Sequence, residues 1–216
     1  MEKVRVVNAN REHLVYVPEI EEAIINASKV KGTGLAKRTQ EYLSLKINEG
    51  KAVIGITESG KFAGFCYIES WSHKKFVANS GLIVVEENRG VGLAMKIKQK
   101  AFKLSRKLFP DAKIFGLTTS LAVMKINSAL GYKPVTFSEL TDDEEFWKGC
   151  HTCSYYDVLF RTNRMHCLCT GMLYDPVKEK KSWIINKSLK KNGKKIKETG
   201  KELIGLISKS KKETHA

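Results

Sequence analysis

The chain has 216 residues, 42% of them hydrophobic, which is enough for one packed domain and an extension. No segment stays apolar over about 18 residues, so we expect no transmembrane helix. The N-terminal residues lack a signal-peptide pattern and the five cysteines fit reduced thiols, so we expect a cytoplasmic protein.

Positive charge is concentrated at the C-terminal end. The net charge is +15, and residues 177–216, with 13 Lys and 4 Glu, supply +9 of it, which leaves +6 for residues 1–176. We therefore predict a mildly basic domain at 1–176 and a basic extension at 177–216. Apolar residues among the lysines of the extension predict an amphipathic helix that packs partly on the domain. Contact with nucleic acid, an anionic membrane surface or a partner subunit is the alternative.

Hydrophobic periodicity predicts alternating strands and helices along the domain. In chain order we expect a strand at 4–8, helices at 12–29 and 40–48, strands at 52–57, 62–70 and 76–85, a helix at 91–108, a strand at 113–117, a helix at 122–130, a strand at 134–137, a helical turn at 144–149, and strands at 155–160 and 167–173. This order predicts a mixed α/β (α+β) domain.

A glycine-rich turn, Arg89-Gly90-Val91-Gly92-Leu93-Ala94, joins the strand at 76–85 to the helix that follows. Such a turn leaves backbone N–H groups unpaired at a helix N-terminus, where phosphate oxygens bind well. The turn lacks the Lys-Ser/Thr ending of a nucleotide P-loop, and its glycines lie too close together for the dinucleotide fingerprint. A turn without function is the alternative.

The spacing Arg-x-x-Gly-x-Ala after a strand resembles the pyrophosphate loop of the GNAT superfamily of acyl-CoA-dependent N-acyltransferases, although Glu86 replaces a proline common there. The resemblance implies a mixed, mostly antiparallel sheet flanked by helices and splayed between strands four and five, where the pantetheine arm lies. It also implies a set of cofactor-binding residues, with an oxyanion contact near the first two: Ile83, Val84, Arg89, Gly90, Val91, Gly92, Leu93 and Ala94.

A second motif narrows the resemblance. The segments Phe115-Gly-Leu-Thr-Thr-Ser120 and Gly131-Tyr-Lys-Pro-Val135 resemble the acyltransferase domain of N-acetylglutamate synthases and of stand-alone arginine-biosynthesis-associated GNAT proteins of Bacteroidetes. This implies transfer of an acetyl or succinyl group from acetyl-CoA or succinyl-CoA to the α-amine of an acidic amino acid, with glutamate as the first candidate. Transfer to another small-molecule amine or a protein amine is an alternative, and an acyl-CoA-sensing binding module is another. We also expect a homodimer.

The catalytic candidates follow from the same resemblance. Many GNAT enzymes carry a tyrosine as general acid where this chain has Asn127, whose amide can hydrogen-bond to a thiolate or a coenzyme amide but cannot act as an acid. An ordinary helix-surface amide is the alternative. Glu69 is the first candidate for the base that takes the ammonium proton, ahead of Tyr67 and Ser80, and an exposed glutamate is its alternative.

An acidic acceptor requires cations. The loop before the helix at 40–48 holds Lys37 and Arg38, and Arg38 suits bidentate binding of a carboxylate. Thr118 and Thr119, at the end of the strand at 113–117, complete the predicted acceptor site. Solvated loop charges are the alternative.

Four cysteines form a CxxC and a CxC pair: Cys150, Cys153, Cys167 and Cys169. Four thiolates at these spacings can close a tetrahedral zinc site, which we predict here with His151 and His166 as substitute ligands. Buried thiols that act as small apolar side chains are the alternative.

Overall fold

The computed structural model describes residues 2–179. Residues 180–216, which hold nearly all of the predicted basic extension at 177–216, lie outside the described residues. The chain divides into two units, Met1–Asp175 and Pro176–Ala216, and the description below concerns the first. No helix in the described part is long and apolar enough to cross a membrane.

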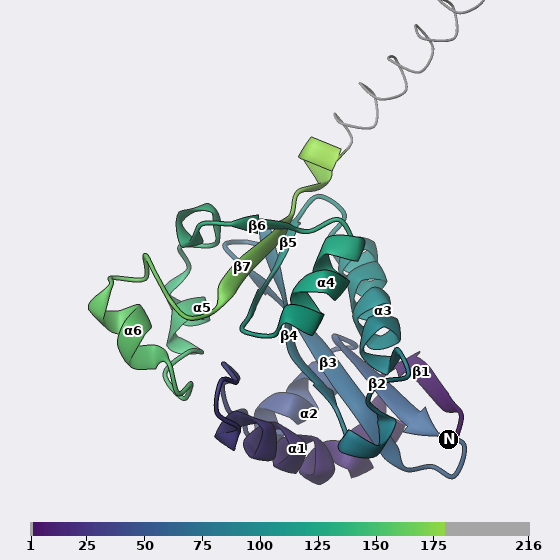
Figure 1. The fold of residues 1–216 in the computed structure, drawn as a ribbon. Helices are drawn as coiled ribbons and strands as arrows, with labels where there is room; N and C mark the ends of the chain where they lie inside the picture. The colour runs from purple at the N-terminus through teal and green to yellow at the C-terminus, as the bar shows by residue number, and fades with distance from the viewer. Residues whose placement is uncertain (1, 180–216) are drawn as a thin grey trace, which may run out of the picture. The chain divides into compact units, whose positions relative to one another are not determined.

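A seven-stranded sheet forms the centre of this unit, in the order β1-β2-β3-β4-β5-β7-β6 (Figure 1). Its strands are β1 (Val4–Asn8), β2 (Ala52–Thr57), β3 (Phe62–Trp71), β4 (Phe76–Val84), β5 (Lys113–Thr118), β6 (Lys133–Val135) and β7 (Thr170–Tyr174). All neighbours pair antiparallel except β4 and β5, which are parallel. The predicted mixed, mostly antiparallel sheet is confirmed.

Helices cover both faces of the sheet (Figure 1). They are α1 (Val17–Lys29), α2 (Gln40–Asn48), α3 (Leu93–Leu108), α4 (Leu121–Ala129), α5 (Glu144–Lys148) and α6 (Tyr156–Arg161). Helices α1 and α2 pack on one face through a core that includes Ile24, Leu43 and Phe65. Helix α3 packs on the other face, where Ile97 meets Cys66 of the same strand β3, as alternation along a strand requires.

The strands β4 and β5 separate after a short paired stretch. Their parallel register covers three pairs and ends at Ala78 opposite Phe115, so the later parts of both strands diverge. Strand β4 has a bulge where it separates from β5. The bulge is seen in the pairing with β3, whose register shifts between Phe65 and Tyr67. Gly81 lies in this bulge with φ of 63°, and a Cβ there would come within 2.6 Å of the Tyr67 ring. The predicted splay is confirmed, and its bulge requires glycine.

Two sequence expectations for residues 155–173 are wrong. Residues 156–160 lie in helix α6 instead of a strand, because a short aromatic run fits either structure and Leu159 is the one buried residue in it. The expected strand at 167–173 begins only at Thr170, so Cys167 and Cys169 lie in the loop that leads into β7. The helix expected at 12–29 starts as a 3₁₀ helix and becomes α1 at Val17, just before Pro18.

Candidate active site

A cavity of about 290 Å³ opens where β4 and β5 separate. Residues 79–83 of β4 and 116–120 after the start of β5 form its sides, and the loop before α2 and the segment around α5 and α6 complete it. Among the described residues its lining contains two cations, Arg38 and Lys98, and no aspartate, glutamate or histidine. The cavity therefore suits an anionic ligand and offers no carboxylate or imidazole as a base.

The glycine-rich turn at 89–94 continues from β4 into α3. Gly92 caps the helix in the left-handed conformation with φ of 77°, and no side chain fills the cap. Gly90 has φ of 80°, and a Cβ at either glycine would meet no atom within 4 Å. Arg89 Nε donates to the Val84 carbonyl oxygen at 3.0 Å, which ties the turn to the strand end. No side chain therefore caps the first N–H groups of α3, but residues 89–94 are absent from the cavity lining, so coenzyme binding at this turn stays a prediction.

Asn127 lines the cavity from α4 and is 1% exposed. Its side-chain oxygen has no hydrogen-bond partner among the described residues. Leaving a buried amide oxygen unpaired costs free energy, so a donor supplied by a ligand would satisfy it. The alternative of a surface amide is therefore wrong, and Asn127 remains a candidate contact for the coenzyme.

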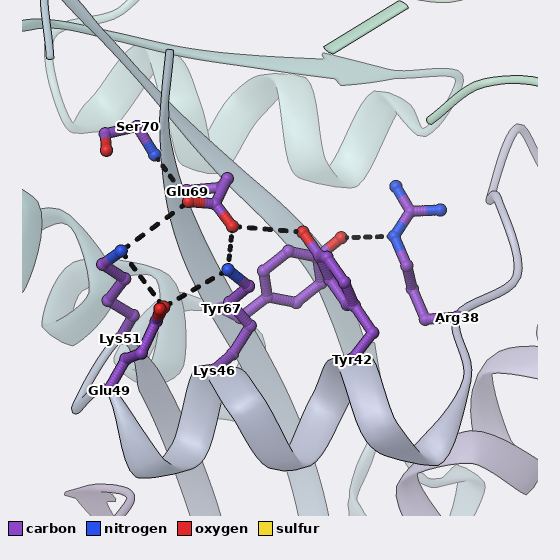
Figure 2. A network of polar contacts seen from close by, with 8 residues as sticks. All are labelled: Arg38, Tyr42, Lys46, Glu49, Lys51, Tyr67, Glu69 and Ser70. Atoms are coloured by element: carbon purple, nitrogen blue, oxygen red, sulfur yellow. Dashed lines mark hydrogen bonds and ion pairs between the residues drawn. The ribbon is translucent and has the colours of Figure 1, made fainter. Parts of the chain in front are cut away.

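Glu69 does not fit the base that we predicted. Its carboxylate forms ion pairs with Lys46 and with Lys51, the latter at 3.7 Å, and it accepts a hydrogen bond from the Tyr42 hydroxyl at 3.4 Å (Figure 2). It is also absent from the residues that line the cavity. A carboxylate that is neutralised by two lysines outside the cavity is poorly placed to take a substrate proton, so the structure argues against this prediction.

Arg38 and Tyr67 do meet in the cavity. Arg38 Nε donates to the Tyr67 hydroxyl at 2.8 Å (Figure 2). Its Nη1 donates to the carbonyl oxygens of Lys37 at 2.8 Å and Gly149 at 3.1 Å. These contacts fix the guanidinium between the loop before α2, strand β3 and the segment after α5. The Lys37 side chain is absent from the lining, so of the two predicted cations only Arg38 faces the site.

The two threonines line the cavity, but their hydroxyl oxygens already accept backbone hydrogen bonds. Thr119 Oγ1 accepts from Gly34 N at 3.1 Å, and Thr118 Oγ1 accepts from Ser120 N at 3.0 Å. Thr119 therefore holds the loop before α2 against the end of β5. The structure brings Arg38, Thr118 and Thr119 together as predicted, with the threonines in supporting positions.

The four cysteines of the CxxC and CxC pairs all line the cavity. A hydrogen bond from Cys169 lowers the pKa of Cys167 to about 6, whereas burial raises the pKa of Cys150 to about 11. Within residues 2–179, no three His, Cys, Asp or Glu side chains are grouped so that they could hold a metal ion. The zinc prediction therefore has no support, because the two loops bring the thiols to one cavity without a coordinating arrangement.

Lys98 is a site residue that sequence reasoning missed. It lies on α3 and is 2% exposed, and its Nζ donates to the Asn79 carbonyl oxygen at 3.3 Å. Burial lowers the pKa of this lysine. The sequence held a signal, since Lys98 stands on the stripe that Leu93, Ile97 and Ala101 bury against the sheet.

No protein-family model and no curated protein matches the chain. Several solved structures, in contrast, are similar to the chain. An N-acetylglutamate synthase from Neisseria gonorrhoeae, complexed with coenzyme A and N-acetyl-glutamate, is similar at 16% identity with a TM-score of 0.58 over 81% of this chain, which spans 35% of that protein. Rv2747 from Mycobacterium tuberculosis in complex with CoA gives 14% identity and a TM-score of 0.57, covering 79% of this chain and 98% of that one.

A third similar structure is that of a different acetyltransferase. A GNAT superfamily phosphinothricin acetyltransferase from Sinorhizobium meliloti, in complex with AcCoA, is 13% identical with a TM-score of 0.55 over 80% of this chain and 88% of that one. At these identities the likeness concerns the fold, and the bound ligands belong to those proteins. The sheet order, the splay and these three likenesses show that the described chain has the GNAT fold.

Proposed function

We propose that this protein is an acyl-CoA-dependent N-acyltransferase. The observation that carries the proposal is the cavity between the separated strands β4 and β5, because the open glycine turn lies at the end of the same strand β4. Phosphates on the turn and a pantetheine arm along the free edge of β4 would place an acyl thioester in the cavity. The CoA complexes of three proteins with this fold support the assignment.

The reaction needs little beyond positioning. A neutral amine attacks the thioester carbonyl, the C–N bond forms, and the C–S bond breaks to release the CoA thiolate. A backbone N–H of β4 near Ile83 and Val84 would stabilise the oxyanion. Because no carboxylate or imidazole of the described residues lines the cavity, the ammonium proton leaves through water, through the Tyr67 hydroxyl or to the Cys167 thiolate, which lines the same cavity. The Asn127 amide would hydrogen-bond to the coenzyme, where its oxygen gains a donor.

The acceptor that fits best is a small amine with a carboxylate, with glutamate as the first candidate. Arg38 is the cation that carries this choice, because it lines the cavity and three acceptors fix its Nε and Nη1, which leaves Nη2 to donate to a carboxylate. The donor is acetyl-CoA or succinyl-CoA. We keep the homodimer, the arginine-biosynthesis role and the partner contacts of the extension at 177–216 as predictions.

A thiol-release assay with acetyl-CoA and succinyl-CoA against a panel of amino acids tests the proposal directly. We expect turnover with acidic amino acids. Turnover only with amines that lack a carboxylate would support the acyltransferase activity and contradict the acidic acceptor. CoA binding without turnover of any amine would favour the binding module, for which the cavity without a carboxylate base and Asn127 in place of a tyrosine are the supporting observations.

Arg38→Ala should raise the KM for glutamate by about 30- to 150-fold, because losing a charge-assisted hydrogen bond costs about 2–3 kcal/mol. The KM for acyl-CoA should change by less than about threefold, and Arg38→Lys should recover only part of the loss. Lys37→Ala is the matched control, since its side chain lies outside the lining. If Arg38→Ala changed only the KM for acyl-CoA, Arg38 would be assigned to coenzyme binding instead of acceptor binding.

A further inference from the structure

Lys98 is a buried lysine beside which the described part of the chain places no carboxylate. Among residues 2–179 it takes part in no ion pair, and its recorded partners are the Asn79 carbonyl oxygen at 3.3 Å and the Tyr132 ring, whose centroid lies 5.8 Å from Nζ. One neutral acceptor satisfies one of three ammonium protons. A buried lysine in this state is destabilising unless something else compensates its charge.

The place of Nζ in the cavity is defined by the sheet. The last β4–β5 pair is Ala78 with Phe115, and Lys98 reaches the next residues on both strands. It donates to Asn79 on β4, and a Cβ on Gly116 of β5 would lie 3.7 Å from Nζ. Nζ therefore stands at the closed end of the space between the strands. The anion-binding turn at 89–94 lies at the other end of β4, so CoA phosphates are not the missing anion.

The groups around Lys98 are already committed elsewhere. The Tyr132 hydroxyl donates to Asn79 Oδ1 at 2.8 Å, and Asn79 Nδ2 donates to Ser105 Oγ at 2.8 Å. The Cys66 thiol donates to the Ser80 carbonyl oxygen at 3.3 Å, and burial raises its pKa, so it stays neutral. This network holds Asn79 and Tyr132 in place and offers Lys98 no negative charge.

We propose that Lys98 binds the free carboxylate of the acyl group, so that the preferred donor is the CoA thioester of a dicarboxylic acid. The inference rests on the proposed function, because the acyl chain reaches the closed end of the cavity only if the pantetheine arm lies between β4 and β5. An acyl group with a terminal carboxylate would supply the anion that residues 2–179 do not place beside Nζ. A short neutral acyl group would leave Nζ unpaired.

Succinyl-CoA and butyryl-CoA test the inference, because their acyl chains have equal length and end in a carboxylate and a methyl group respectively. With the wild-type protein, we expect kcat/KM to favour succinyl-CoA by at least about tenfold, the range for a charged hydrogen bond. Lys98→Met should lower kcat/KM for succinyl-CoA by a similar factor relative to butyryl-CoA, so that the ratio of the two donors falls to about one. Lys96→Met, an exposed lysine on the same helix, is the control.

Three results would overturn the inference. Equal use of the two donors by the wild-type protein would show that nothing in the cavity reads the carboxylate, and this comparison needs no variant. A rise in the KM for the amine acceptor in Lys98→Met would place the acceptor on Lys98. An intact-mass increase by one acyl group on Lys98, after incubation without acceptor, would make the lysine a nucleophile instead.

A binding measurement separates this inference from the proposed function. If no amine is acylated, calorimetry of the wild-type protein and Lys98→Met with the same two thioesters still compares the carboxylate with the methyl group. Preferential binding of succinyl-CoA that Lys98→Met abolishes would support the inference while the acyltransferase proposal fails. Equal affinities would overturn the inference on binding alone.

Discussion

Glu69 and Lys98 are two buried charges on opposite sides of the sheet, and their surroundings differ. Glu69 is 13% exposed at its side chain and has two lysines and a tyrosine hydroxyl as partners, drawn from α2 and the turn between α2 and β2 (Figure 2). Lys98 is 2% exposed and has one carbonyl oxygen. A protein compensates a charge that it keeps for its own stability, so the uncompensated one is better explained by a ligand.

Glu69→Gln should give the largest effect on stability. It would leave Lys46, which is 4% exposed, with Glu49 as its remaining carboxylate at 3.3 Å. Breaking a buried ion pair on one side costs about 3 kcal/mol, which chemical denaturation would measure. Turnover should change by less than about threefold, because Glu69 lies outside the cavity. Glu145→Gln, an exposed glutamate paired with Lys148, is the control.

A hundredfold loss of turnover in Glu69→Gln, with the fold intact, would contradict a purely structural role for Glu69. Glu69 would then act in the chemistry, and its lysines would tune it for that role.

Gly92→Asp should abolish most CoA binding. The new side chain would be strained at φ of 77° and would bring a negative charge to the open N-terminus of α3. We expect the affinity for CoA, measured by calorimetry, to fall on the order of 100-fold. Gly60→Asp is the matched control, because Gly60 has φ of 84° in the open turn between β2 and β3 and does not lie at a helix N-terminus. If both variants lost the same CoA affinity, backbone strain alone would explain the effect, and the turn at 89–94 would not be the phosphate site.

The parts of the site that the sequence could predict are local. The turn at 89–94 needs only a strand, two glycines and a helix start, all of which are adjacent in the chain. The splay followed from the resemblance that this turn carries. Tyr67 and Glu69 lie on the same side of β3, yet only Tyr67 reaches the cavity, because Glu69 meets the lysine that α2 brings to the strand end.

The parts that could not be predicted depend on packing between distant segments. The role of Arg38 as an anchor depends on Gly149, which is 111 residues away in the chain. The aromatic run at 155–160 fits a strand as well as it fits α6, and the choice depends on how Leu159 packs. Lys98 had a local signal, a lysine on the buried stripe of an amphipathic helix, but its lack of a counter-ion emerges only from the folded structure.

Lys98→Met should raise the stability of the ligand-free protein, in the opposite direction to Glu69→Gln. Replacing an unpaired buried amine with an apolar side chain of similar length gains about 1–2 kcal/mol. Thermal unfolding should show a higher Tm for the variant, and saturating succinyl-CoA should narrow the difference because it binds the wild-type protein better. Lys96→Met should leave the Tm unchanged, since Lys96 is exposed.

The pH dependence of this difference identifies its origin. Burial lowers the pKa of Lys98 in the folded protein below that of the unfolded chain, so the unfolded chain binds more protons between the two values. Wild-type stability therefore rises with pH through this range, and the advantage of Lys98→Met shrinks as pH approaches the lysine value of about 10.4.

Cys66 and Tyr132 face Lys98 and titrate too, and burial raises the pKa of each. The contribution of Tyr132 cancels in the difference between the two proteins, whereas the charge of Lys98 lowers the pKa of Cys66, so the comparison is made with Cys66→Ala in both proteins. An advantage that is independent of pH would mean that packing alone separates methionine from lysine. A destabilised variant would mean that the protein does compensate Lys98, and the contrast with Glu69 would fail.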